Sequence, residues 1–399
     1  MERLGSNSME EVYIRGIGMT KFGKFLDLSM KDMARESVEE VLADAEMESK
    51  DIQAIFFANS LAGLITGQEC IRGEVVTYPL GFGTIPIHNV ENACASGGNA
   101  LHLAWMAVAS GMCDTAMALG VEKANHIDKS VTFAAYRSGT DVEEMFATGS
   151  GSGIDRTPLV DRQAALAKEL MSEKGFTSDA FGIIAAKAYQ YGALNPKAHR
   201  QNGHNLSTVL GSRMVVDPIT SLMSSPVSDG GAAVIVSRLR GRGAAIRIAG
   251  SRLASRPPKG VAVPSSVRAA TTAAYEAAGI APSEIEIAEI HDASVAYEVI
   301  AWEGCGLCPI GDELKWAMSG HTAMGGVLPI NTSGGLISRG HALGASGLAQ
   351  INELVLQLRG NAGPRQVDGA RVALAQIGGG VIDWQTSVST AHVLIRESA

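Results

Sequence analysis

The chain has 399 residues, of which 46% are hydrophobic and 19% are charged, a balance typical of folded proteins rather than disordered ones. At about 150 residues per domain, this length predicts two or three domains. The net charge of −8 disfavours binding to nucleic acid or to an anionic membrane surface.

Targeting signals and disulfides are not expected. Residues 1–9 are polar, and no apolar run reaches the roughly 18 residues of a membrane span. The cysteines are odd in number and sparse, which indicates free thiols rather than a disulfide framework. We therefore expect a cytoplasmic protein.

An internal repeat is the most informative large-scale pattern. Val41–Asn59 and Ala274–Asp292 both read as an alanine-rich helix, a short turn, an acidic residue followed by isoleucine, and an apolar strand. The repeat predicts two similar halves, residues 1–240 and 241–399.

A second pair of matching segments follows in the same order. Ile85–Ile87 and Leu328–Ile330 each precede a turn rich in glycine and serine, then a helix and an apolar strand. The helices are expected near 98–110 and 345–359, and the strands at Thr115–Val121 and Arg371–Ile377. Alternating strands and helices predict an α/β fold of two βαβαβ halves, with parallel sheets covered by helices.

Residues 125–215 have no counterpart in the second half. We expect helices at Val160–Gly175 and Ser178–Tyr191, and a strand at Gly231–Ser237 that closes the first half. An insertion of this length exceeds what a connection requires, so it predicts a cap over the substrate.

Cys94 follows a predicted strand and precedes a predicted helix. A turn there places the sulfur at the helix N-terminus, where the helix dipole favours a thiolate. The matching turn of the second half carries His341, and a third turn, His291–Ser294, ends another predicted strand. Strand ends of this kind form the binding crevices of α/β sheets. Cys94 is thus a candidate nucleophile with His341 as its base.

Four motifs occur in a characteristic order: ENACASGG around Cys94, HDAS from His291, GHALGASG around His341 and AQIGGG from Ala375. With the SDGGAA segment at Ser228, they resemble the active-site loops of the thiolase superfamily. The His-Asp pair resembles the sterol-carrier-protein-type branch. The resemblance covers nearly the whole chain and implies a five-layered α-β-α-β-α core.

The resemblance also implies roles for single residues. Cys94 would carry the acyl group as a thioester, and His341 would take the thiol proton. His291 and a water would hold the thioester enolate, while the N–H groups of Cys94 and Gly378 would hold the tetrahedral intermediate. Asp292, Gln376, Asn331 and Ser346 would support these groups.

Two positions depart from the family pattern. Thiolases use a second cysteine for proton transfer, but this chain has Gln376 at one usual position and Ala293 at the other. Either His341 or a water serves both proton transfers, or Asp292, Tyr297 or Cys305 replaces the cysteine.

Coenzyme A, as free CoA or acyl-CoA, is the expected co-substrate. Its phosphates could meet arginines in or beside the insert: Arg137, Arg156, Arg162 and Arg213. The CxxC at Cys305–Cys308 lacks further ligands at suitable spacing, so no metal is expected.

The resulting hypothesis is a CoA-dependent acyltransferase that cleaves a 3-ketoacyl-CoA with CoA. The unusual proton-transfer positions favour a branched or aromatic acyl group, with benzoylsuccinyl-CoA as an example. The alternatives are an aldolase that cleaves a β-hydroxyacyl-CoA, or a non-catalytic thiolase-like subunit. A homodimer is expected, with a small zinc-ribbon and OB-fold partner subunit as a further possibility.

Overall fold

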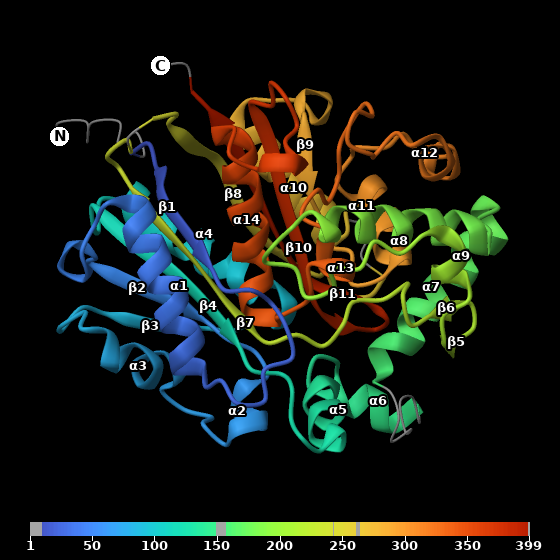
Figure 1. The fold of residues 1–399 in the computed structure, drawn as a ribbon, viewed down its shortest axis with the longest axis horizontal. Helices are drawn as coiled ribbons and strands as arrows, with labels where there is room; N and C mark the ends of the chain where they lie inside the picture. The colour runs from blue at the N-terminus through green and yellow to red at the C-terminus, as the bar shows by residue number, and fades with distance from the viewer. Residues whose placement is uncertain (1–9, 149–156, 242, 261–263, 398–399) are drawn as a thin grey trace.

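The computed structural model describes residues 10–148, 157–241, 243–260 and 264–397, and Figure 1 shows their arrangement. Helix α1 illustrates how the sequence defines an element. Ser29 caps its start, because the Asp32 N–H donates to Ser29 Oγ at 3.2 Å and the Ser29 N–H donates to Asp32 Oδ2 at 2.9 Å. The first half contains β1 (Tyr13–Met19), α1 (Met30–Ala45), β2 (Ala54–Ala58), α2 (Ala62–Thr66), α3 (Arg72–Thr77), β3 (Ile87–Val90), α4 (Ser96–Ala109), β4 (Thr115–Glu122) and β7 (Gly230–Ser237).

The second half repeats this order. It contains β8 (Ile246–Ser255), α10 (Ser266–Ala278), β9 (Ile287–Glu289), α11 (Val295–Gly304), α12 (Glu313–Ser319), α13 (Gly335–Ser338), α14 (Leu343–Arg359), β10 (Val372–Ile382) and β11 (Gln385–Arg396). The sequence repeat is visible in detail, since the short 3-10 turns Ser49–Asp51 and Pro282–Glu284 occupy matching places before β2 and β9.

Among the described residues, nine strands form one sheet in the order β3-β2-β4-β7-β1-β8-β11-β10-β9. The two halves are therefore related by an approximate twofold rotation at the β1–β8 contact, which pairs Tyr13 with Arg247 and Ile14 with Ile246, and β3 has no matching strand in the second half of the described sheet. The duplicated topology is confirmed, whereas the domain limits 1–240 and 241–399 stay a prediction.

The expectation of parallel sheets is wrong in part, because the sheet is mixed. Only β2–β3, β2–β4 and β9–β10 are parallel among the pairings of the described strands. Strand β11 follows β10 through a tight hairpin and so must run antiparallel. Strand β7 also pairs antiparallel with β4 and β1. Strand β7 follows the long insert rather than a single helical crossover, so its connection to β4 does not impose parallel pairing.

The layers follow the expected α-β-α-β-α order (Figure 1). Helix α1 packs on the outer face of the strands of the first half, and α10 covers the strands of the second half. Helices α4 and α14 lie between these two parts of the sheet. The two central helices approach through glycine. A Cβ at Gly97 would come within 2.7 Å of the Gly344 carbonyl oxygen, and one at Gly347 within 2.5 Å of the Gly98 nitrogen. This contact brings the N-termini of α4 and α14 together.

The insert packs on the second half of the molecule and also covers the cavity described below. Helix α8 packs on α12 and α13, and α7 packs on α11, so much of the insert covers the second half. Among the described residues, no helix combines the length and apolarity needed to cross a bilayer. The insert contains α5 (Lys129–Arg137), α6 (Val142–Thr148), α7 (Pro158–Lys174), α8 (Ser178–Ala193), α9 (Leu206–Leu210), β5 (Met214–Val216) and β6 (Ile219–Thr220).

Candidate active site

A cavity of about 490 Å³ opens where the two halves meet beneath the insert. Cys94, His291 and His341 all line it, together with the glycine run Gly378–Gly380. The three turns that were expected to converge from strand order therefore do converge. Helices α5 and α7 supply the opposite wall through Tyr136, Leu159 and other residues.

The turn that carries Cys94 is tightly fixed. Ser96 Oγ accepts from the Asn92 N–H at 2.8 Å and donates to the Ala93 carbonyl at 2.6 Å. Ala93 has a φ of 49°, in the left-handed region that few non-glycine residues adopt. Strand β10 passes directly behind the turn, where a Cβ at Gly379 would come within 2.1 Å of the Asn92 oxygen. These constraints place the half-buried sulfur at the start of α4.

The acidity of Cys94 differs from the sequence expectation. Burial, reinforced by the nearby carboxylates Glu122 and Glu91, raises the pKa of the Cys94 thiol to about 12. Hydrogen bonds from the N–H groups of Cys94 and Gly380 act in the opposite direction but are the weaker influence. The expected stabilised thiolate is therefore wrong for the resting site, and the thiol needs a base.

His341 has the geometry of such a base. Its Nδ1 lies 2.8 Å from Ser346 Oγ, and that hydroxyl donates to the Ala342 carbonyl at 2.9 Å. Because the hydroxyl proton is committed, Ser346 accepts the Nδ1 proton and leaves the Nε2 lone pair free. Nε2 is buried and without a partner among the described residues. Burial, with His291 and Arg339 nearby, lowers the pKa of His341 well below 6.5, so its ring is neutral.

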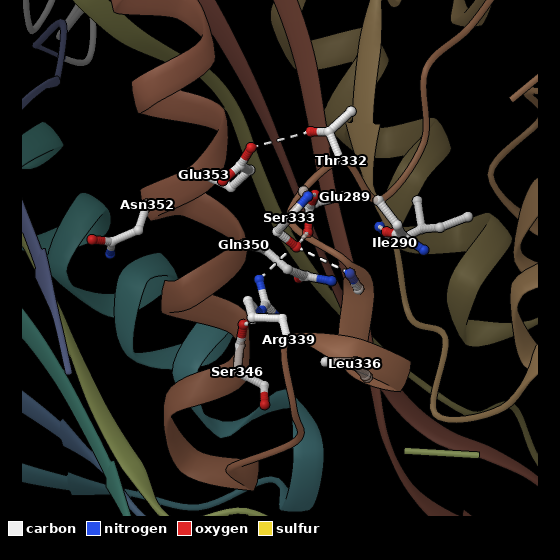
Figure 2. Close-up of polar contacts among 12 residues, drawn as sticks. Glu289, Ile290, Thr332, Ser333, Leu336, Arg339, Ser346, Gln350, Asn352 and Glu353 are labelled. Carbon is white, nitrogen blue, oxygen red and sulfur yellow. Dashed lines mark hydrogen bonds and ion pairs between the residues drawn. The ribbon is translucent and has the colours of Figure 1, made fainter. Parts of the chain in front are cut away.

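A buried polar network holds the loop that carries His341. Glu289, at the end of β9, accepts from the Ser333 N–H at 2.9 Å and the Ser333 hydroxyl at 2.7 Å. Arg339 pairs with Glu289 at 3.4 Å and donates to the Ser346 carbonyl at 3.4 Å. Figure 2 shows Arg339 between these partners. Removing one member of such a pair would leave a buried charge uncompensated.

His291 faces His341 across the cavity. Their ring centroids lie 5.9 Å apart at an interplanar angle of 82°. Burial lowers the pKa of His291 to about 4, so this ring is also neutral at physiological pH. Its Nδ1 has no hydrogen-bond partner within the described part of the chain. The site thus presents one thiol and two neutral imidazoles to a common space.

Family models match both halves of the chain. The model described as "Thiolase, N-terminal domain" covers residues 12–202, and the one described as "Thiolase C-terminal domain-like" covers residues 254–393. The chain belongs to the thiolase family. It is an acyltransferase of that family, as the four motifs suggested.

Thiolase relatives of known name match over almost the whole chain. Sterol carrier protein 2 of Bos taurus is 34% identical, covering 93% of this chain and 71% of the relative. The acetyl-CoA acetyltransferase of Methanothermobacter thermautotrophicus is 34% identical, and the match covers 93% of this chain and 97% of the relative. The benzoylsuccinyl-CoA thiolase subunit BbsB of Thauera aromatica is 32% identical, covering 93% and 95%. These relatives confirm the expected branch of the family.

Solved structures confirm the thiolase fold. The Ltp2-ChsH2(DUF35) aldolase superposes with a TM-score of 0.80 at 22% identity, covering 99% of this chain and 100% of that one. Human mitochondrial 3-ketoacyl-CoA thiolase in complex with CoA gives a TM-score of 0.72 at 15% identity, covering 98% and 99%.

The supporting residues of this thiolase hold loops rather than line the cavity. Gln376 Oε1 accepts from the His291 N–H at 3.2 Å, and its Nε2 donates to Ser389 Oγ at 3.0 Å. Asp292 Oδ1 accepts from the Leu336 N–H at 2.7 Å. Asn331 Oδ1 accepts from the Ile290 N–H at 2.8 Å, and its Nδ2 donates to Glu298 Oε2 at 3.3 Å. Each of the three joins the His291 loop to a neighbouring segment.

Two candidates for the second proton-transfer group do not fit. Cys305 is buried beneath a different surface pocket, beside Arg268 and Tyr275. Asp292 is fully buried behind its loop and does not line the cavity. Tyr297 does line it. Sequence reasoning also missed Gly380, whose N–H is directed at the Cys94 sulfur.

The arginines expected to bind the CoA phosphates do not all lie at the cavity. Arg213 lines the cavity, whereas Arg162 lines a small adjoining pocket of about 30 Å³ and Arg137 lines neither. Arg156 lies outside the described residues. Sequence reasoning missed Lys24, Lys129 and Arg200, which line the cavity. No motif marks them, because they converge only through the fold. Among the described residues, no group of three or more His, Cys, Asp or Glu is arranged to hold a metal.

Proposed function

We propose that this protein is a thiolase that cleaves a 3-ketoacyl-CoA with CoA through a thioester on Cys94. The observation that carries the proposal is that a half-buried, neutral Cys94 thiol and an unpartnered His341 Nε2 line one cavity. A nucleophile and a base oriented by a third group form the usual arrangement for covalent acyl transfer.

The first half of the reaction follows from this arrangement. His341 Nε2 takes the Cys94 proton, and the sulfur attacks the 3-keto carbon. The N–H groups of Cys94 and of the Gly378–Gly380 run are the proposed donors to the developing oxyanion, and removing one such donor typically costs about 10²–10³ in rate. The C2–C3 bond then breaks, and His291 with a water holds the enolate oxygen until C2 gains a proton.

The second half returns the acyl group to CoA. The CoA sulfur attacks the Cys94 thioester, the thioester bond breaks, and Cys94 regains its proton from the His341 imidazolium. Basic residues of the cavity wall could contact the CoA phosphates: Lys24, Lys129, Arg200 and Arg213. Arg137, Arg156, Arg162 and Arg213 were expected in this role, and among the described three the cavity favours Arg213.

The acyl group is proposed to be branched or aromatic. The cavity wall includes Phe133, Tyr136, Leu159 and Val160, which suit an apolar acyl group wider than a straight chain. The similarity to a benzoylsuccinyl-CoA thiolase subunit supports the same substrate class.

The test is a product assay with intact-protein mass measurement. Purified protein is incubated with CoA and a panel of 3-ketoacyl-CoA thioesters, straight, branched and aromatic. We expect two acyl-CoA products and an acyl mass increment on Cys94. Cleavage of β-hydroxyacyl-CoA without any protein-bound acyl group would support the aldolase alternative, and no turnover by any assembly would support a non-catalytic subunit.

The pH profile provides a second test. His341 acts as a base only when neutral, and its pKa lies well below 6.5. Activity should therefore persist as the pH falls through 6.5 and decline only below it, as measured by kcat/KM between pH 5 and 9. An acid limb centred near pH 7 would contradict control by His341 and implicate Glu122 or Glu289, because burial raises the pKa of each to about 7.

A homodimer is proposed from the open edge of the sheet. Strand β3 has a neighbour on one side only, and His88 and Asn89 on it are exposed. Tyr78 and Ile71, in the segment before β3, are 90% and 61% exposed. Unpaired edge strands with apolar flanks favour pairing with another chain.

A small zinc-ribbon and OB-fold partner is the further proposal. The names of two relatives, a thiolase subunit and a DUF35-containing aldolase, support it. The purified chain should form a dimer in light scattering and show higher kcat/KM when co-purified with such a subunit. Full turnover and tight CoA binding by the chain alone would contradict the need for this partner.

A further inference from the structure

The proposed cleavage lacks an identified group to protonate C2 of the enolate. Gln376 and Ala293 stand where the family places a cysteine for this step. Gln376 cannot titrate, and both of its amide atoms are hydrogen-bonded away from the cavity. Ala293 lines the cavity but carries no proton. A replacement must therefore come from another side chain on the cavity wall.

Tyr297 lies in the first turn of α11, four residues after Ala293 in the chain. Ser294 caps helix α11, and the Tyr297 N–H donates to Ser294 Oγ at 3.5 Å. Ala293 directly precedes this cap in the chain, and both Ala293 and Tyr297 line the cavity. The Tyr297 ring packs edge-on against the His291 ring, with centroids 5.4 Å apart at 89°. Its phenol therefore belongs to the part of the cavity where the enolate is held.

The Tyr297 hydroxyl has no hydrogen-bond partner among the described residues, whereas the hydroxyls of two other tyrosines do have partners. Tyr191 accepts from the Met324 N–H at 2.6 Å, and Tyr275 donates to the Cys305 carbonyl at 2.9 Å. Buried tyrosine hydroxyls usually find a partner. A free phenol on a cavity wall is available to donate to a bound molecule.

The surroundings keep this phenol protonated. Burial raises the pKa of Tyr297 to about 12, with Arg162 opposing the shift and Cys94 adding to it. A protonated phenol that contacts His291 and lines the same cavity as Cys94 is what the second step requires.

We propose that Tyr297 is the second acid/base of the proposed thiolase reaction. Its hydroxyl donates its proton to C2 of the enolate, which leaves as an acyl-CoA. The resulting phenolate takes the thiol proton of the incoming CoA, whose sulfur attacks the Cys94 thioester. The inference rests on the proposed function, and the Tyr297 hydroxyl ends each cycle protonated again.

Tyr136 is the competing phenol. It also lines the cavity and makes no hydrogen bond through its hydroxyl within the described residues. However, it packs with Leu61 and Leu343, and the other ionisable groups around it are Cys94, Glu122 and Asp229. Tyr297 is the tyrosine that contacts His291, which makes it the better donor to the enolate.

The experiment separates carbon chemistry from acyl transfer in Tyr297→Phe. The first probe is acetyl-CoA in D₂O, where deuterium entering C2 reports the second acid/base. The second is the acetyl mass increment on Cys94, which needs no proton transfer at carbon. We expect deuterium exchange to fall about 10²- to 10⁴-fold while Cys94 is still acetylated.

Matched variants complete the design. Tyr275→Phe removes a buried phenol beneath a different surface pocket and should keep the wild-type exchange rate. Thermal unfolding checks that Tyr297→Phe is folded, and Tyr136→Phe tests the competing phenol.

The possible outcomes distinguish a failure of the proposed thiolase function from a failure of the proposed role of Tyr297. Absence of acetyl-Cys94 in the wild type contradicts the proposed function itself. Three other outcomes overturn the role of Tyr297 alone. They are acetylation without deuterium exchange in the wild type, a wild-type rate of deuterium exchange in Tyr297→Phe, and a larger loss of deuterium exchange in Tyr136→Phe than in Tyr297→Phe.

Discussion

Replacing Cys94 with alanine is expected to lower kcat by about 10⁴-fold or more, because the covalent route disappears and only binding and oxyanion stabilisation remain. The acyl mass increment should vanish as well. Cys94 is held by its turn and by the close passage of β10, so the variant should keep the fold.

The matched controls are Cys113→Ala and Cys70→Ala. Both residues are free thiols, and neither lines the cavity. We expect both variants to retain wild-type turnover and acylation. Retained turnover in Cys94→Ala, with no protein-bound acyl group in either protein, would exclude the covalent mechanism.

Replacing His341 with asparagine should cost about 10³- to 10⁴-fold in kcat. With a thiol pKa of about 12, only a very small fraction of Cys94 is ionised at pH 7.5, and the loss of Nε2 removes the group that takes its proton. Asparagine can still hydrogen-bond to Ser346, which limits damage to the loop.

The measurement is burst kinetics of Cys94 acylation, with two comparisons. The double variant Cys94→Ala/His341→Asn should be no slower than Cys94→Ala, since residues acting as a unit are non-additive. Raising the pH toward 9 should partly restore acylation in His341→Asn, because hydroxide replaces the missing base. Near-normal acylation at pH 7.5 would mean that another group deprotonates Cys94.

The amino-acid sequence alone was enough to predict the family, the duplicated α/β fold and the convergence of Cys94, His291 and His341. These features depend on short-range patterns. The helix-turn-strand repeat at Val41–Asn59 and Ala274–Asp292 is local. Cys94 and His291 follow strands β3 and β9, where α/β sheets form their crevices, and His341 lies in the loop that leads into α14. Motif order along the chain carried the same information, so the fold and the three residues could be named together.

What only the tertiary structure decided depends on contacts between distant segments. Strand direction in β7 and β11 depends on how each is connected, so the sheet is mixed rather than parallel. The neutral state of Cys94 depends on burial and on Glu122, which outweigh the helix dipole that sequence reasoning relied on. Gln376 supports the His291 loop because it accepts a hydrogen bond from the His291 N–H. Tyr297 packs against His291, and its hydroxyl has no partner among the described residues. Desolvation and hydrogen-bond satisfaction are properties of the packed molecule, and for that reason no spacing in the sequence could reveal them.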